Sequence, residues 1–278
     1  MHYRIQLFCF FFLFFIGSPA FSQNLEFGLI GGGAGYMGDM NQNKPLKISG
    51  ISAGANVKLN LDPYWSVGLH YTHGKIKAND LESENEQFRQ RGLNFKSSLN
   101  EFSLQVDFNF FEYFAGGGTK NFTPYIFAGI GGVWFNPIGK YDIPSDPGEK
   151  EYQLRFYRTE GQKDTYPNSA FTVPYGIGFK VRLKDNWGLF SQIGYRTAYT
   201  DYLDDVSGRY PAADFAANDP ADLRLIREHL SGFRSNDPSL PVTNLYGTQR
   251  GDLRKRDTYM FVGIGISYTF VSQKCYTF

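Results

Sequence analysis

Apolar and polar residues alternate along the stretch from Met260 to Phe270. One face carries Met260, Val262, Ile264, Ile266, Tyr268 and Phe270, and the other carries Gly263, Gly265, Ser267 and Thr269. A period of two is the pattern of a β-strand. A half-buried strand of a soluble protein also alternates, but it rarely combines so apolar a face with one so rich in glycine. The pattern therefore favours a strand of a membrane-spanning β-barrel.

Seven further segments repeat this pattern, which gives eight predicted strands. They are 25–37, 51–59, 65–73, 101–110, 125–135, 173–183, 187–200 and 260–270. Each is about as long as the nine to eleven residues of a tilted membrane strand. Because only a closed sheet satisfies its backbone in lipid, we predict an all-β fold, an eight-stranded antiparallel transmembrane β-barrel. The alternative is a soluble β-sandwich with an unusually apolar outer face.

Short and long connections alternate between the predicted strands. The short ones are 60–64, 112–121 and 184–186, and the long ones are 38–47, 77–92, 137–170 and 201–256. Bacterial barrels have short periplasmic turns and long extracellular loops. We therefore expect both termini to be periplasmic. A helix is predicted at 221–230, directly after Pro220.

The first residues have the pattern of an export signal. Arg4 lies in a basic start, 7–16 is apolar, and the small residues Ala20 and Ser22 precede an expected cleavage site. The apolar run of about ten residues is too short for a spanning helix. We therefore predict a cleaved signal peptide over 1–22, a barrel over 23–270 and a short periplasmic tail over 271–278, in the outer membrane.

Composition narrows the function classes. The formal net charge is +1, so no excess of basic residues indicates binding to nucleic acid. Aromatic residues make up 18% of the chain and glycine accounts for 31 residues, which suits a barrel with aromatic girdles and a tightly filled interior. The expected surroundings are outer-membrane lipid.

Six charged residues are predicted to face the barrel interior: Lys58, Glu101, Asp107, Lys180, Arg182 and Arg196. An eight-stranded barrel has an interior just wide enough for side chains, and buried charges require partners. We therefore predict a neutralising network in a plugged barrel. The alternative is an ion path.

Three carboxylates lie close together where the seventh predicted strand ends, at Asp201, Asp204 and Asp205. Carboxylate oxygens can bind a hard cation, but the spacing is not that of a calcium loop. We therefore favour a hydrogen-bonded loop base, with Arg209 or Arg250 as partner, and keep a cation site as the alternative. No resident metal or cofactor is predicted.

Nothing in the sequence indicates an enzyme. His73 is expected near the outer rim of the third strand, but no serine is placed beside it, and a nucleophile needs its base within hydrogen-bond reach. Gly31 to Gly35 is not a phosphate-binding loop, because neither a helix start nor a suitably spaced lysine follows.

Several segments together carry a resemblance to a known family. They are Tyr36-Met-Gly-Asp39, 101–111 (EFSLQVDFNFF), 123–130, 173–178, 196–210 (RTAYTDYLDDVSGRY), Arg250-Gly251 and Asp257-Thr-Tyr259. The succession resembles the PorG family, small outer-membrane barrels of the type IX secretion system of Bacteroidetes. The resemblance implies a non-enzymatic component that anchors a periplasmic ring, built from a lipoprotein and its partner protein, to the outer membrane. Cargo would pass through a separate, larger barrel.

A second function class remains open. The chain is alternatively a free-standing small barrel that acts as an adhesin, an envelope stabiliser or a carrier of small apolar solutes. Cys275 is the only cysteine after the predicted signal peptide, and the tail is expected in an oxidising compartment. It is either a free thiol or half of an intermolecular disulfide. Given the resemblance, we predict a disulfide to the ring lipoprotein.

Overall fold

The computed structural model describes residues 24–115, 119–143, 146–212, 215–232, 245–252 and 254–271. The predicted signal peptide and Cys275 lie outside these residues. None of the helices in the described ranges is long and apolar enough to cross a membrane.

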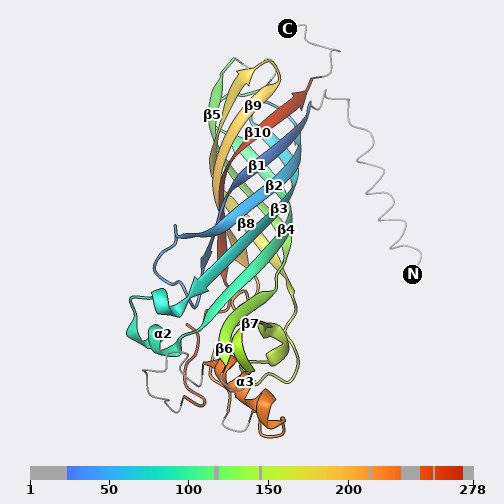
Figure 1. Cartoon of the computed structure of the whole chain (residues 1–278). Coiled ribbons are helices and arrows are strands. Elements are labelled where there is room, and N and C mark those ends of the chain that lie inside the picture. Colours follow the sequence, from blue (N-terminus) through green and yellow to red (C-terminus); the bar gives the residue numbers. More distant parts are fainter. Residues whose placement is uncertain are drawn as a thin grey trace, which may run out of the picture.

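Eight strands form a closed antiparallel barrel (Figure 1). In chain order they are β1 (Asn24–Met37), β2 (Ile48–Asn60), β3 (Trp65–Asn79), β4 (Asn94–Asn109), β5 (Phe122–Trp134), β8 (Ser169–Lys184), β9 (Trp187–Ala198) and β10 (Thr258–Phe270). The spatial order β3-β2-β1-β10-β9-β8-β5-β4 is closed by pairing of β3 with β4. The predicted fold is thereby confirmed.

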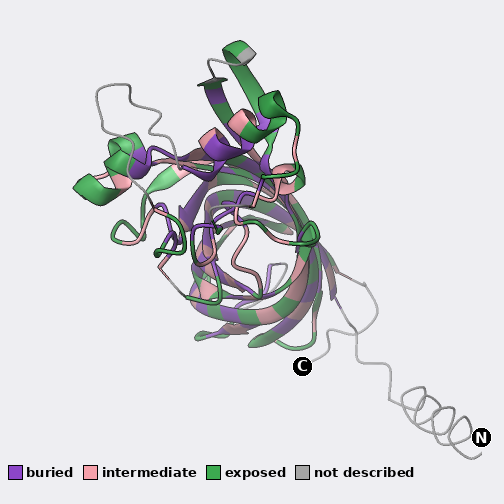
Figure 2. Cartoon of the chain, turned by 90° about the horizontal axis from the view of Figure 1, so that it is seen from below, coloured by how far each residue is buried: buried purple, intermediate pink, exposed green. Residues whose placement is uncertain are grey.

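The outer face of the barrel is apolar and exposed. Ile264 on β10 and Leu29 on β1 are each 64% exposed, and the apolar residues Leu104, Val106 and Ile177 are also exposed. Exposed and buried positions alternate around the ring of strands (Figure 2). An apolar surface of this extent cannot be tolerated in water but matches the lipid-facing band of a membrane barrel.

Glycine on the inner face leaves space for aromatic rings. A Cβ atom on Gly178 would lie 2.5 Å from Cε1 of Tyr125, whose ring fills the interior beside it. Tyr125 also donates a hydrogen bond to Gln192 on β9, two strands away, at 3.1 Å. The interior is therefore filled by side chains, as expected for eight strands.

The long connections form an ordered cap at one end of the barrel (Figure 1). They contain η1 (Asp80–Glu82), α2 (Glu86–Arg91), the hairpin of β6 (Pro137–Ile143) and β7 (Asp146–Gln153), η2 (Leu154–Tyr157) and α3 (Ala221–Ser231). The hairpin extends the sheet through pairs of β6 with β4, Lys96 with Ile138 and Ser97 with Pro137. The predicted helix at 221–230 is present as α3, whereas α2 and the hairpin were not predicted.

The main apolar core lies beneath this cap. Its buried members include Tyr36 of β1, Phe95 and Leu99 of β4, Leu203 and Leu230. Segments of the loops cross the end of the ring of strands (Figure 2). The core therefore joins the cap to the ends of the strands next to it and surrounds the polar groups at the base of the cap.

Candidate functional site

The segment after β9 turns inward at the base of the cap. Leu203, Asp204, Asp205 and Val206 are all at most 1% exposed. Asp205 has a φ of 69°, a left-handed conformation that aspartate adopts more readily than most residues. The predicted loop base is thus a buried turn, with acidic side chains inside it.

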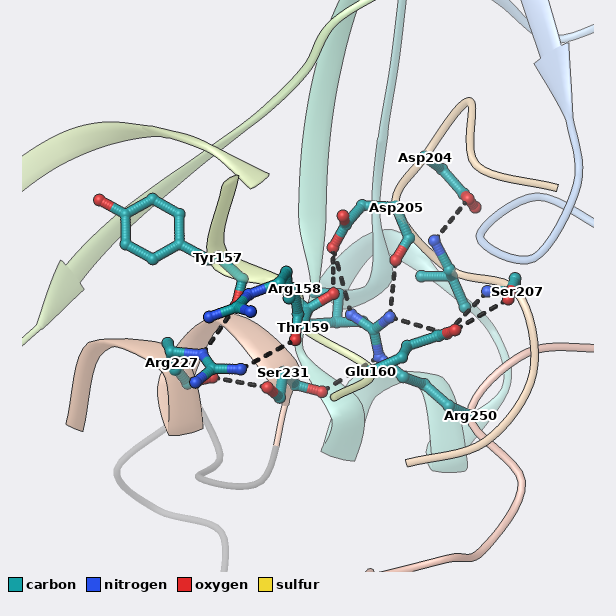
Figure 3. A network of polar contacts seen from close by, with 12 residues as sticks. Tyr157, Arg158, Thr159, Glu160, Asp204, Asp205, Ser207, Arg227, Ser231 and Arg250 are labelled. Atoms are coloured by element: carbon teal, nitrogen blue, oxygen red, sulfur yellow. Dashed lines mark hydrogen bonds and ion pairs between the residues drawn. The ribbon is translucent and has the colours of Figure 1, made fainter. Parts of the chain in front are cut away.

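Arg250 crosses this turn and joins three parts of the cap (Figure 3). Its Nη1 donates hydrogen bonds to Oε1 of Glu160 at 3.0 Å and to the main-chain oxygen of Asp205 at 2.6 Å. Its Nε donates to the main-chain oxygen of Ser231, the last residue of α3, at 3.2 Å. Although burial lowers the pKa of Arg250, Glu160 and Asp205 raise it above its ordinary value. This guanidinium therefore holds the cap together as a permanent charge.

Asp205 accepts hydrogen bonds from two further side chains. Thr159 donates to Oδ2 at 2.5 Å and Tyr166 donates to Oδ1 at 2.7 Å. Oδ2 also lies 3.7 Å from Nη2 of Arg250. Burial raises the pKa of Asp205 to about 6, with Arg250 and the two hydroxyl groups acting in the opposite direction. The carboxylate is thus held by one cation and two neutral donors.

Glu160 caps the end of the same turn. Its Oε1 accepts from the backbone N–H groups of Ser207 and Gly208 at 2.8 and 3.2 Å, and its Oε2 accepts from Oγ of Ser207 at 2.8 Å. The connection between β7 and β8 is therefore tied to the connection after β9. This residue was not singled out in the sequence.

Arg91 brings α2 into the network. It forms a bidentate ion pair with Asp80, with Nε at 2.6 Å and Nη2 at 2.8 Å from the two carboxylate oxygens. Its Nη1 and Nη2 donate to the main-chain oxygens of Arg250 and Asp39, at 2.6 and 3.2 Å. Arg91 and Asp80 are both buried, so this pair positions the α2 segment over the loop base.

A second group of carboxylates lies beside this turn. One carboxylate oxygen from each of Asp39, Asp204 and Asp257 lies within 4.8 Å of the others, and all three residues are buried. The barrel seam explains the meeting, because Met37 at the end of β1 pairs with Thr258 at the start of β10. Within the described residues, this is the one acidic group with metal-ligand spacing.

Backbone and phenol groups supply the hydrogen bonds of these carboxylates. Tyr36 donates its hydroxyl hydrogen to Oδ2 of Asp204, and the Val206 N–H donates to Oδ1 at 2.9 Å. The Leu203 N–H donates to Asp257 at 3.0 Å. Burial raises the pKa of Asp204 and of Asp257 well above the usual range, and the neighbouring carboxylates raise it further.

The three predicted acids are therefore divided between two environments. Asp205 belongs to the Arg250 network, and Asp204 belongs to the group with Asp39 and Asp257. Asp201 is half-buried, and burial together with Asp39 and Asp252 raises its pKa to about 7. Of the two predicted arginine partners, Arg250 pairs with Asp205, whereas Arg209 donates to the main-chain oxygen of Gly247 at 3.1 Å.

Residues 5–218 match a family model described as "Domain of unknown function (DUF6089)". The chain belongs to this family. No curated protein matches this chain.

Similar solved structures include a protein of Yersinia pestis, a Neisserial protein and a protein of Thermus thermophilus. Ail, the attachment invasion locus protein of Yersinia pestis, is 8% identical with a TM-score of 0.40, over 90% of this chain and 100% of that one. Neisserial surface protein A is 10% identical with a TM-score of 0.37, over 91% and 100%. A major outer membrane protein from Thermus thermophilus is 12% identical with a TM-score of 0.39, over 88% and 99%. The barrel described above rests on its own strand pairings.

In this DUF6089 chain, five of the six predicted interior charges form two clusters. In the first, Asp107 accepts from Nζ of Lys58 at 2.6 Å and from Nζ of Lys180 at 2.9 Å. Lys180 also donates to Asn109 at 3.1 Å. All four residues are buried, and they connect β2, β4 and β8 across the interior.

Glu101 and Arg196 form the second cluster, nearer the cap. Nε of Arg196 lies 3.3 Å from Oε2 of Glu101, and Tyr259 donates to the same oxygen at 2.5 Å. The guanidinium also lies 4.7 Å from the ring centroid of Phe261. The sixth predicted charge, Arg182, lies at the opposite end, where it donates to Asn121 at 2.6 Å.

Proposed function

We propose that this chain is an outer-membrane barrel of the type IX secretion machinery, where it anchors a periplasmic ring of a lipoprotein and its partner protein. The part of the proposal that concerns the membrane is supported by the closed barrel with its exposed apolar belt. An eight-stranded barrel with a filled interior has no room for a secreted protein. Its role in secretion is therefore attachment and not passage.

The observation that carries the proposal is the meeting of four of the seven segments that resemble the PorG family. Asp39 from the first segment, Asp204 and Asp205 from the DYLDDVS stretch, and Arg250 and Asp257 from the last two lie together at the loop base. These segments are far apart in the chain but build one buried structure. Their meeting supports the proposal, because residues of one structural unit are expected to be retained together.

The two ends of the barrel differ in a way that suits an anchor. The first residue of β1 and the last of β10 lie at the end opposite the cap, where the strands are joined by short connections (Figure 1). In the proposed orientation this end faces the periplasm. The ring is thereby contacted through the turns and not through the long loops.

Affinity purification tests the proposal. The tagged chain should bring down a stoichiometric ring lipoprotein from detergent-solubilised envelopes. Lys184→Glu, at the exposed end of β8 next to the turn that leads to β9, should weaken this association. Lys163→Glu is the matched control, because Lys163 is an exposed lysine in the connection between η2 and β8, in the cap. A barrel that purifies alone under mild detergent would contradict the anchor.

One feature favours the second candidate, a free-standing barrel whose loops bind an external ligand. The cap is an ordered platform with a hairpin and two helices, although an anchor needs only the opposite end. Deletion of the hairpin 137–153 separates the two functions. Loss of attachment to surfaces with secretion intact would support the adhesin, and loss of neither would leave the anchor as the better proposal.

A further inference from the structure

The carboxylates of Asp39, Asp204 and Asp257 are buried together, and no lysine or arginine among the described residues forms an ion pair with them. All three side chains are at most 1% exposed. The guanidinium of Arg91 donates to the main-chain oxygen of Asp39 and forms its ion pair with Asp80. Buried carboxylates that lie together need a compensating positive charge or protons.

A second observation concerns the unsatisfied oxygen of Asp39. Its Oδ1 accepts a hydrogen bond from the Asp252 N–H, whereas its Oδ2 is fully buried and has no hydrogen-bond partner among the described residues. Buried polar oxygens in native proteins nearly always have a partner. This oxygen is therefore available to a ligand at the carboxylate group.

Two glycines allow the backbone to lie close to the carboxylates. A Cβ atom on Gly38 would lie 2.3 Å from Oδ1 of Asp257 and 2.2 Å from the hydroxyl oxygen of Tyr36. A Cβ atom on Gly251 would lie 3.0 Å from Oδ1 of Asp39. Any larger residue at position 38 would thus enter the group itself.

We propose that Asp39, Asp204 and Asp257 bind one hard divalent cation of the calcium type, which fastens the cap to the seam between β1 and β10. The donors are all carboxylate oxygens, the ligands that calcium prefers. Two oxygens bound to one calcium ion at about 2.3–2.6 Å lie at most roughly 5 Å apart. The observed separations, within 4.8 Å, fit this limit.

The protonation behaviour agrees with this geometry. Burial and mutual repulsion raise the pKa values of Asp204 and Asp257, and burial raises that of Asp39 to about 7. A bound cation relieves the same repulsion without protons. The ion joins the loop after β1, the turn after β9 and the residue before β10, which are distant in sequence. The site goes beyond the proposed anchoring function and does not depend on it.

Metal binding to the purified full chain in detergent tests the proposal. After treatment with a chelator, the chain should bind one Ca²⁺ in calorimetry at free concentrations up to about 1 mM, the range of extracellular calcium modules. Tb³⁺ should bind in competition with Ca²⁺. Its luminescence should be excited through tyrosine, because the Tyr36 hydroxyl group contacts Asp204.

Three variants locate the site. Asp39→Asn and Asp257→Asn should each weaken Ca²⁺ binding by about tenfold or more, because loss of even an outer partner of a metal ligand costs that much. Asp201→Asn is the matched control, since Asp201 is on the same segment as Asp204 but outside the group. Because Asp201 interacts with the group only at long range, this substitution should weaken Ca²⁺ binding by much less than tenfold.

Thermal unfolding gives a readout that does not depend on binding alone. Ca²⁺ should raise the melting temperature of the wild-type chain and not that of Asp257→Asn. In chelator, Asp257→Asn should be at least as stable as wild type, since it removes one repelling charge and keeps the shape. The proposal is overturned if the wild-type chain binds neither Ca²⁺ nor Tb³⁺ saturably, or if Asp201→Asn weakens binding as much as the other two substitutions.

Discussion

At the scale of single residues, Glu101 shows how the barrel tolerates charge in its interior. Its side chain is completely buried between Arg196 and Tyr259. A buried ion pair adds little net stability, but removal of one partner leaves the other charge without compensation. The arrangement is therefore sensitive to substitution although it contributes little to the free energy of folding.

Substitution of Glu101 by glutamine should reveal this sensitivity. The variant keeps the shape but leaves Arg196 without a carboxylate, so the free energy of unfolding should fall by about 3–5 kcal/mol. Tyr259→Phe removes one hydrogen bond to the same oxygen and should cost less, about 1.5–3 kcal/mol. Urea unfolding in lipid vesicles, followed by tryptophan fluorescence, measures both. Equal losses in the two variants would contradict this account.

Arg250 in the cap, outside the membrane, resembles Glu101 in being a buried charge with several partners. Its replacement by methionine, which keeps the apolar stem, removes the donors to Glu160, Asp205 and Ser231. The segment that follows η2 should then become open to protease while the barrel stays folded. Limited proteolysis combined with heat-dependent electrophoretic mobility tests this. Arg209→Met is the control, because Arg209 is exposed and contacts only a main-chain oxygen among its described partners.

At the scale of elements, the sequence indicates strands only where they meet lipid. The predicted fourth strand begins at Glu101, but β4 begins at Asn94. The outward residues of β4 before Glu101 include Lys96 and Ser98, which are polar because they lie between the apolar belt and the cap. The hairpin was missed for the same reason, since β7 (DPGEKEYQ) has no apolar alternation and depends on pairing with β6.

The free-energy cost of a charge on β4 should depend on its depth in the membrane, and this can be tested directly. Val106→Arg places a charge on the lipid-facing side, in the middle of the outward apolar positions of the β4 segment, and should cost about 2–4 kcal/mol. Ser98→Arg lies on the same face of the same strand but beyond the apolar belt, so its cost should be near zero. Urea unfolding in vesicles compares the two variants. Equal costs would mean that the belt does not lie in lipid.

At the scale of the whole molecule, the filled interior predicts a barrel without conductance. Two groups of charges fill the interior at different heights along β4: the Lys58–Asp107–Lys180 cluster and the Glu101–Arg196 pair. Buried aromatic rings such as that of Tyr125 also occupy the interior. The purified chain in a planar bilayer should therefore show no stable ion steps. Reproducible openings that disappear with Glu101→Ala or Arg182→Ala would contradict a plugged barrel.

The sequence predicted the barrel better than it predicted the site, and the reason is physical. Alternation is local, so it is visible in ten residues. The meeting of Asp39, Asp204 and Asp257 depends on which strands become neighbours and in which register. Asp204 and Asp205 are adjacent in the chain, yet their side chains have different partners. No pattern within one segment contains that information.

The seam between β1 and β10 has a consequence for the order of folding. These are the strands furthest apart in the chain, so their pairing has the largest loop-closure entropy cost and is expected late. Asp39 follows β1 and Asp257 precedes β10, and they can approach only when this pairing has formed. The three carboxylates are therefore still separate and hydrated in a half-inserted chain. Their assembly marks the moment at which the barrel closes.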